Sequence, residues 1–112
     1  GDNIAKLWTS DGELVREFKG HSCTIYQASF SPDDKFIVLA SCDGTASVWD
    51  IEGHKKRTLK YHKSGVSAAR FSPNGKTILT ASFDKKGVLW NLEGKKIVSS
   101  IIVRALFSRR QY

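Results

Sequence analysis

Residues of the types that build a nucleophilic active site occur in the first half of the chain. His21, Ser41 and Asp43 supply an imidazole, a hydroxyl and a carboxylate, and Trp49 follows closely. In a catalytic triad the hydroxyl attacks, the imidazole takes its proton and the carboxylate orients the imidazole. If these side chains met in an open cleft, they would suit hydrolysis or acyl transfer.

The same four residue types recur later in the chain, which argues against catalysis. His62, Ser82, Asp84 and Trp90 each follow their first-copy counterparts by 41 residues (for example 90 − 49). An enzyme has little use for one identical active site per repeat. We therefore expect a structural role for both sets and no catalytic residue. Labelling of Ser41 by a serine-reactive probe would favour the enzyme instead.

The tryptophans define the length of the repeat. Trp8, Trp49 and Trp90 are separated by 41 residues each (49 − 8 and 90 − 49). A fixed period of this size is typical of folds built from one repeated supersecondary unit. The same step relates further aspartates and glycines, namely Asp2, Asp43 and Asp84, and Gly12, Gly53 and Gly94.

Short apolar runs between turn residues predict strands and no helices. Gly or Pro falls roughly every 8 to 12 residues, and the runs between are rich in Val, Ile, Thr, Phe and Trp. Residues 36–40 are apolar at consecutive positions, as expected of a strand buried on both faces, whereas 57–61 alternate and are charged, as expected of an edge strand. The predicted strands are 4–8, 14–18, 24–30, 36–41, 46–49, 57–61, 66–71, 77–82, 88–91 and 97–102.

Several motifs occur in one fixed order within each repeat. Gly20-His21, Phe30-Ser31-Pro32-Asp33, residues 39–45 and Val48-Trp49-Asp50 together resemble one WD40 repeat, and residues 62–91 resemble a second, less regular copy. The resemblance implies an all-β fold, a segment of a WD40-type β-propeller whose blades are four-stranded antiparallel sheets. It also implies a non-enzymatic scaffold that mediates protein–protein interactions.

The resemblance divides the chain into two full blades and two incomplete parts. Residues 1–18 would be the outer two strands of a partial blade, 19–59 the first full blade, 60–102 the second, and 103–112 an atypical tail, either a frayed outer strand or a shortened next strand. A propeller ring needs about four to eight blades. We therefore expect a fragment of a larger propeller or a chain that self-associates, which light scattering would test. A truncated product without independent function is the third interpretation.

In the resembling family the recurrent residues form a buried hydrogen-bonded tetrad. The Asp accepts from the His, the other His nitrogen accepts from the Ser hydroxyl, and that hydroxyl accepts from the indole N–H. Every donor then has an acceptor, as burial of a carboxylate and an imidazole requires. The tetrads so implied are His21, Ser41, Asp43 and Trp49; His62, Ser82, Asp84 and Trp90; and, in part, Asp2 and Trp8.

The resemblance also implies that a protein or peptide partner docks on the face that carries the Asp turns and the His loops. An aromatic residue in a turn has little core to fill, so Phe83 is expected either to anchor a partner or to pack against a neighbouring blade. Lys85 replaces the turn glycine of the first repeat, and its turn is expected to differ in type or be strained. The expected partner-binding positions are Thr24, Cys42, Lys63 and Phe83.

The two cysteines are expected to be small buried thiols and not a disulfide or a redox pair. Cys23 and Cys42 have Ser64 and Phe83 as repeat counterparts, so the repeat requires neither. Two cysteines in 112 residues are too few for a domain built on disulfides, and they lack the spacing of a metal site. We therefore expect a reduced, cytoplasmic protein with no metal and no cofactor.

The chain is basic, with 18 Lys and Arg against 11 Asp and Glu and a net charge of +7. Most basic residues fall on turns and on the outermost strand, where Lys opposes edge pairing, so a solvated surface is favoured. The alternative function is a basic surface that binds nucleic acid or another acidic partner, with affinity falling steeply between about 50 and 200 mM salt. Nucleic acid is disfavoured because no aromatic residues are interleaved to stack bases.

The apolar runs are far shorter than the roughly 20 residues of a membrane span.

Overall fold

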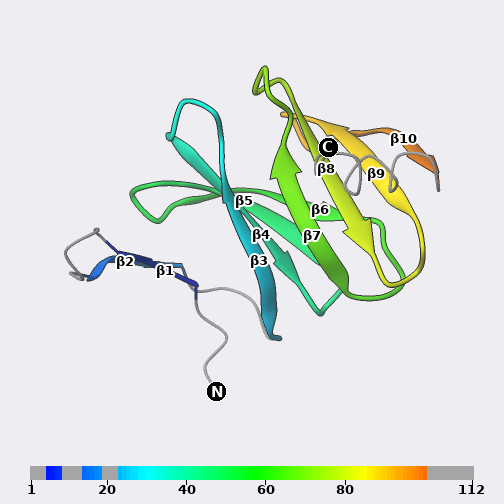
Figure 1. Cartoon of the computed structure of the whole chain (residues 1–112), viewed down its shortest axis with the longest axis horizontal. Coiled ribbons are helices and arrows are strands. Elements are labelled where there is room, and N and C mark those ends of the chain that lie inside the picture. Colours follow the sequence, from blue (N-terminus) through cyan, green and yellow to red (C-terminus); the bar gives the residue numbers. More distant parts are fainter. Residues whose placement is uncertain (1–4, 9–13, 19–22, 101–112) are drawn as a thin grey trace, which may run out of the picture.

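Two four-stranded antiparallel sheets make up most of the molecule (Figure 1). We describe the chain from a computed structural model that places residues 5–8, 14–18 and 23–100, the first two segments as strand backbone alone. These residues form ten strands and no helix, so none of them belongs to a helix that could cross a membrane. The all-β prediction is confirmed.

The strands follow one another along each sheet as an antiparallel meander. Each predicted strand is present, with small shifts at its ends. We call the two large sheets the first and second blade. The first blade has the order β3 (Ile25–Phe30), β4 (Phe36–Ser41), β5 (Thr45–Asp50) and β6 (Lys55–Lys60); the second has β7 (Val66–Phe71), β8 (Thr77–Ser82), β9 (Gly87–Asn91) and β10 (Lys96–Ser100); β1 (Ala5–Trp8) pairs with β2 (Leu14–Phe18).

The three tryptophans occupy one recurring place in the backbone. Each lies beside a β-bulge, where the next strand carries an extra residue and its ladder is locally interrupted. The sequence period is therefore a period of the structure, as the spacing predicted. The strand pairs at these bulges are Trp8 with Leu14, Trp49 with Lys55, and Trp90 with Lys96.

The main core lies between the two blades. Alternate residues of β4 point toward it, while Ile37 and Leu39 point the other way and cluster with Trp49 on the far face of the first blade. Strand β4 is therefore buried on both faces, as predicted. In β6 only Leu59 is buried, which confirms the prediction of an exposed outer strand. The core between the blades comprises Val38, Ala40, Ala46, Val48, Leu59, Val66, Ala69, Phe71, Ile78, Val88 and Trp90.

The inner strands hold the blades together and define two faces. Strand β7 packs against β3 and β4, and the Ala69 N–H donates to the Gln27 side-chain oxygen at 2.9 Å. One end of this seam carries the β4–β5 and β8–β9 turns, residues 23–24 before β3 and the loop before β7. We call this end the docking face. The other end carries the β3–β4, β5–β6, β7–β8 and β9–β10 turns, and we call it the opposite face.

Candidate functional site

A continuous hydrogen-bond chain runs beneath the docking face of the second blade. Asp84, in the β8–β9 turn, places its Oδ2 3.1 Å from Nδ1 of His62, which lies in the loop before β7. His62 Nε2 is 2.9 Å from the Thr80 hydroxyl on β8, and the Trp90 indole N–H donates to the same oxygen at 2.9 Å. Each of these polar atoms is paired, which offsets the cost of burying them.

The expected role of Ser82 in this chain is wrong, because Thr80 supplies the bridging hydroxyl. Ser82 ends β8 at the turn, where its hydroxyl accepts from the Asp84 backbone N–H at 3.0 Å and donates to the Ser64 carbonyl at 3.2 Å. Thr80 lies two residues before Ser82, further from the turn and on the same face of the strand. A polar residue inside the apolar run of β8 was the signal that could have identified Thr80 from the sequence.

The first blade differs again, and the expected role of Ser41 is also wrong. The Trp49 indole N–H donates to the Ser47 hydroxyl at 2.7 Å. The Ser41 hydroxyl instead accepts from the Asp43 backbone N–H at 3.3 Å, as its counterpart does in the second blade. Leu39 occupies the place of the bridging threonine and has no hydroxyl to offer.

Three of the expected tetrad positions are not tested by the structure. His21 and Asp2 lie outside the described residues, and only the backbone of Trp8 is described. Asp43 caps its own turn, where its Oδ1 accepts from the Thr45 backbone N–H at 2.9 Å. The membership of His21, Asp2 and Trp8 in tetrads stays a prediction, as do the assigned blade boundaries.

The Asp84 carboxyl titrates below its ordinary range. Partial burial raises its pKa, but the backbone N–H groups of Lys86 and Lys63 and the His62 ring lower the pKa by more than burial raises it. The two N–H groups lie 2.9 and 3.2 Å from the carboxylate oxygens. The ionised carboxylate therefore ties the β8–β9 turn to the loop before β7.

The hydrogen-bond chain is closed to solvent. Thr80 is 0 % exposed and the His62 side chain is 1 % exposed. A catalytic hydroxyl must be reached by its substrate, and this one is covered. The arrangement orients the turns of the docking face, and it is not an open active site.

A family model described as "WD domain, G-beta repeat" (WD40) matches the chain twice, at residues 12–50 and 53–91. These matches cover more than half of the sequence. Each match spans the outermost strand of one sheet and the first three strands of the next, β2 to β5 and β6 to β9 respectively. The chain belongs to the WD40 repeat family. No curated protein matches the chain. WD40 repeats generally act as protein-interaction scaffolds.

The docking face of this WD40 chain brings two aromatic rings together across the blade seam. Phe83, in the β8–β9 turn, meets Tyr26 of β3 edge to face, with ring centroids 5.6 Å apart and planes at 84°. The rings nevertheless remain 59 % and 49 % exposed, respectively. Phe83 therefore touches a neighbouring blade and still faces solvent. Tyr26 was not among the expected positions, because its place on an inner strand gave no signal that its ring would be exposed.

The other expected docking positions surround these rings. The Thr24 carbonyl accepts from the Cys42 N–H at 2.9 Å, and the Phe83 N–H donates to the Gly65 carbonyl at 3.1 Å. Lys63 is exposed, and its backbone N–H donates to Asp84 Oδ2 at 3.2 Å. The structure thus places all four expected positions on one face, and backbone hydrogen bonds fix the turns that carry them.

The prediction of two free thiols is wrong, because Cys23 and Cys42 form a disulfide with a Cα–Cα distance of 5.5 Å. The hydrogen bond from Cys42 to Thr24 brings the two residues side by side, and the Cα distance is within the range of disulfides. Both residues are only partly buried. The bond joins the loop before β3 to the β4–β5 turn. The cytoplasmic location stays a prediction.

The β8–β9 turn copies the β4–β5 turn despite its lysine. Lys85 has φ of 71° and Gly44 has φ of 89°, so both are left-handed. The expectation of a different turn type is therefore wrong, while strain is expected because a side chain disfavours this conformation. Gly44 has a second reason to be glycine, since a Cβ there would lie 3.0 Å from the His62 carbonyl oxygen.

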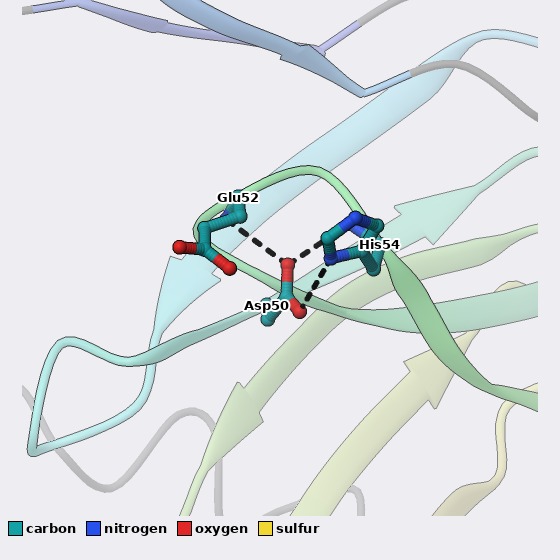
Figure 2. Close-up of side chains that lie close together, drawn as sticks. All are labelled: Asp50, Glu52 and His54. Atoms are coloured by element: carbon teal, nitrogen blue, oxygen red, sulfur yellow. Dashed lines mark hydrogen bonds and ion pairs between the residues drawn. The ribbon is translucent and has the colours of Figure 1, made fainter.

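The β5–β6 turn gathers three groups of metal-ligating type, Asp50, Glu52 and His54 (Figure 2). Asp50 Oδ1 accepts from the backbone N–H groups of Glu52 and His54 at 3.0 and 2.9 Å, and its Oδ2 lies 3.0 Å from His54 Nδ1. The His54 backbone N–H is the largest of the influences that bring the Asp50 pKa to about 2. The carboxylate is thus already engaged by the turn.

The second blade shows that this arrangement serves the turn. Asn91 replaces the aspartate in the β9–β10 turn, and its Oδ1 accepts from the Glu93 and Lys95 N–H groups, both at 3.0 Å. An amide makes the same backbone contacts without the charge that a metal site would use. We therefore interpret the Asp of the Trp-Asp pair as a turn cap.

Proposed function

We propose that this WD40 chain is a non-enzymatic scaffold whose protein or peptide partner docks on the surface formed by Thr24, Tyr26, Cys42, Lys63 and Phe83. The observation that carries the proposal is the exposed Tyr26–Phe83 pair. Large apolar side chains that stay exposed on an ordered surface are typical of interaction sites. Aromatic residues also dominate the binding energy of many protein interfaces.

The frame beneath the pair supports this role. Phe83 is held by its N–H bond to the Gly65 carbonyl, and the adjacent Asp84 is fixed by His62 and by the backbone of Lys63. A ring on such a fixed turn loses little conformational freedom when a partner covers it. Preorganisation of this kind raises affinity because less entropy is lost on binding.

Peptide selection tests the proposal with an unbiased set of candidate partners. A phage-displayed library is panned on the wild-type chain, and the enriched peptides are synthesised and measured by calorimetry. Phe83→Ala should weaken binding by about tenfold or more and leave the melting temperature unchanged. Ile97→Ala is the matched control, because it trims an exposed apolar side chain on β10 away from this surface.

Two results would contradict the proposal. In the first, Phe83→Ala lowers the melting temperature and leaves peptide affinity intact, so that the ring is a core residue. In the second, both variants weaken binding equally.

The alternative function, binding of nucleic acid or another acidic partner through the exposed basic residues of β6, would instead give affinity for a DNA oligonucleotide that falls steeply with salt.

A further inference from the structure

A hollow of about 400 Å³ lies on the opposite face, between the two blades. The β3–β4 turn and β6 bound it on the first blade, and the β7–β8 and β9–β10 turns bound it on the second. Its apolar lining includes Phe36, Val48, Phe71 and Leu92. We call this hollow the seam groove. Its volume is at the low end for ligand pockets, which suits a short segment and not a folded domain.

The bulge between β5 and β6 brings two basic residues to the seam groove. Val48 pairs with Arg57 and the next β5 residue, Trp49, pairs with Lys55, so Lys56 is the extra residue. A bulge interrupts the alternation of side chains along a strand. Lys56 and Arg57 accordingly both line the groove.

Arg57 spans the seam, and it forms no ion pair with a described carboxylate, although Asp33 also lines the groove. Its stem lies over the β9–β10 turn, where a Cβ added to Gly94 would be 3.4 Å from Arg57 Cδ. Its Nη1 donates to the Lys56 carbonyl at 2.8 Å. Among the described residues its guanidinium makes no ion pair with Asp or Glu. Four guanidinium N–H groups therefore remain for an anionic ligand.

The corresponding bulge of the second blade carries no charge. Leu89 pairs with Val98 and Trp90 with Lys96, so Ile97 is the extra residue there. Ile97 and Val98 are exposed apolar side chains. The basic pair of β6 is thus a property of this groove and not of the repeat backbone.

We propose that the seam groove binds a short acidic peptide from another protein. The peptide inserts one large apolar side chain against Phe36, Val48 and Phe71 and sets a neighbouring carboxylate on the Arg57 guanidinium. Charge complementarity favours this occupant, because an apolar pocket beside an unpaired guanidinium suits an apolar residue next to a carboxylate. This site is separate from the docking face.

Two synthetic peptides probe the seam groove in the full chain. One holds a single tryptophan between aspartates, and the other has lysines in place of the aspartates. Fluorescence anisotropy measures affinity, and amide NMR shifts locate the bound peptide. The acidic peptide should bind, shift the Gly75 and Leu92 amides, and lose about tenfold or more in affinity to Arg57→Glu.

Lys60→Glu is the matched control, because it makes the same charge change on an exposed residue of the same strand that does not line the groove. It should change affinity by less than about twofold. Leu92→Ala trims the apolar lining and should weaken binding on its own. The proposal is overturned by equal losses in the two charge variants, by equal binding of the lysine peptide, by amide shifts confined to Tyr26 and Phe83, or by no binding below about 1 mM.

Discussion

Replacement of Thr80 by valine removes one hydroxyl from the hydrogen-bond chain and keeps the shape of the side chain. The hydroxyl bridges His62 Nε2 and the Trp90 indole, each at 2.9 Å. Thr80, His62 and Trp90 are all buried, so water cannot take its place. Both neighbours would be left without their partner.

The expected loss follows from these two contacts. A buried polar group that loses its partner costs about 1–3 kcal/mol. Two such groups that share one oxygen should together lower the free energy of unfolding by about 2–4 kcal/mol. Small domains are typically stable by only about 5–15 kcal/mol, so the melting temperature should fall by about 8 °C or more.

The first blade offers a compensating substitution. In the first blade the aliphatic Leu39 of β4 lies opposite Ser47 of β5, which carries the hydroxyl. In the second blade the hydroxyl is on Thr80 of β8, and the aliphatic Val88 lies opposite it on β9. The two residue types have therefore exchanged strands between the blades. The double variant Thr80→Leu/Val88→Ser should give the Trp90 indole an acceptor on its own strand. In a double-mutant cycle the two changes should couple favourably by about 1 kcal/mol.

Urea denaturation followed by tryptophan fluorescence and circular dichroism measures both effects, with the slope of the transition held in common. A loss below about 0.5 kcal/mol in Thr80→Val would refute the bridging role, since ordinary surface substitutions fall within that range. A coupling energy near zero would refute the exchange of hydroxyl positions between the blades.

Other substitutions test the turns, the carboxylate and the disulfide. Lys85→Gly should raise the free energy of unfolding by about 0.5–1 kcal/mol by relieving left-handed strain, whereas Gly44→Ala should lower it; the same urea titrations measure both. The lowered pKa of Asp84 means that its stabilisation is present above the unfolded pKa of about 4 and is lost as pH falls toward the folded pKa. Stability of Asp84→Asn should therefore fall less than that of the wild type between about pH 5 and 3, and parallel acid slopes would contradict this. Cys23→Ser should cost about 3 kcal/mol, the closure entropy of a loop of this length, and dithiothreitol should destabilise the wild type but not this variant.

The repeat fold was predictable because it rests on patterns of residue type. Three tryptophans at one spacing mark the same bulged position, and the apolar run of β4 marks a strand buried on both faces. Both features follow from burial and strand periodicity, which a sequence displays directly.

The identity of the hydrogen-bonding residues in the candidate site was less predictable, because it depends on how far along a strand each residue lies from the turn. Ser82 and Thr80 share a face of β8, and only the structure places the threonine level with the indole. Cys23 and Cys42 are 19 residues apart in the sequence. They become neighbours because the Cys42 N–H donates to the Thr24 carbonyl, a contact that the sequence spacing does not predict. Tyr26 shares the exposed aromatic surface only because the two blades pack at this seam.

The bulges beside Trp49 and Trp90 share one backbone geometry but carry different side chains. The ladder is interrupted at the same place in both blades, and the side chains at 56–57 and 97–98 differ in charge while the backbone path recurs. One pair is cationic and the other aliphatic in this chain. A repeat of this kind can thus acquire a new recognition chemistry at each outer strand by exchanging two adjacent residues, with no adjustment of its core.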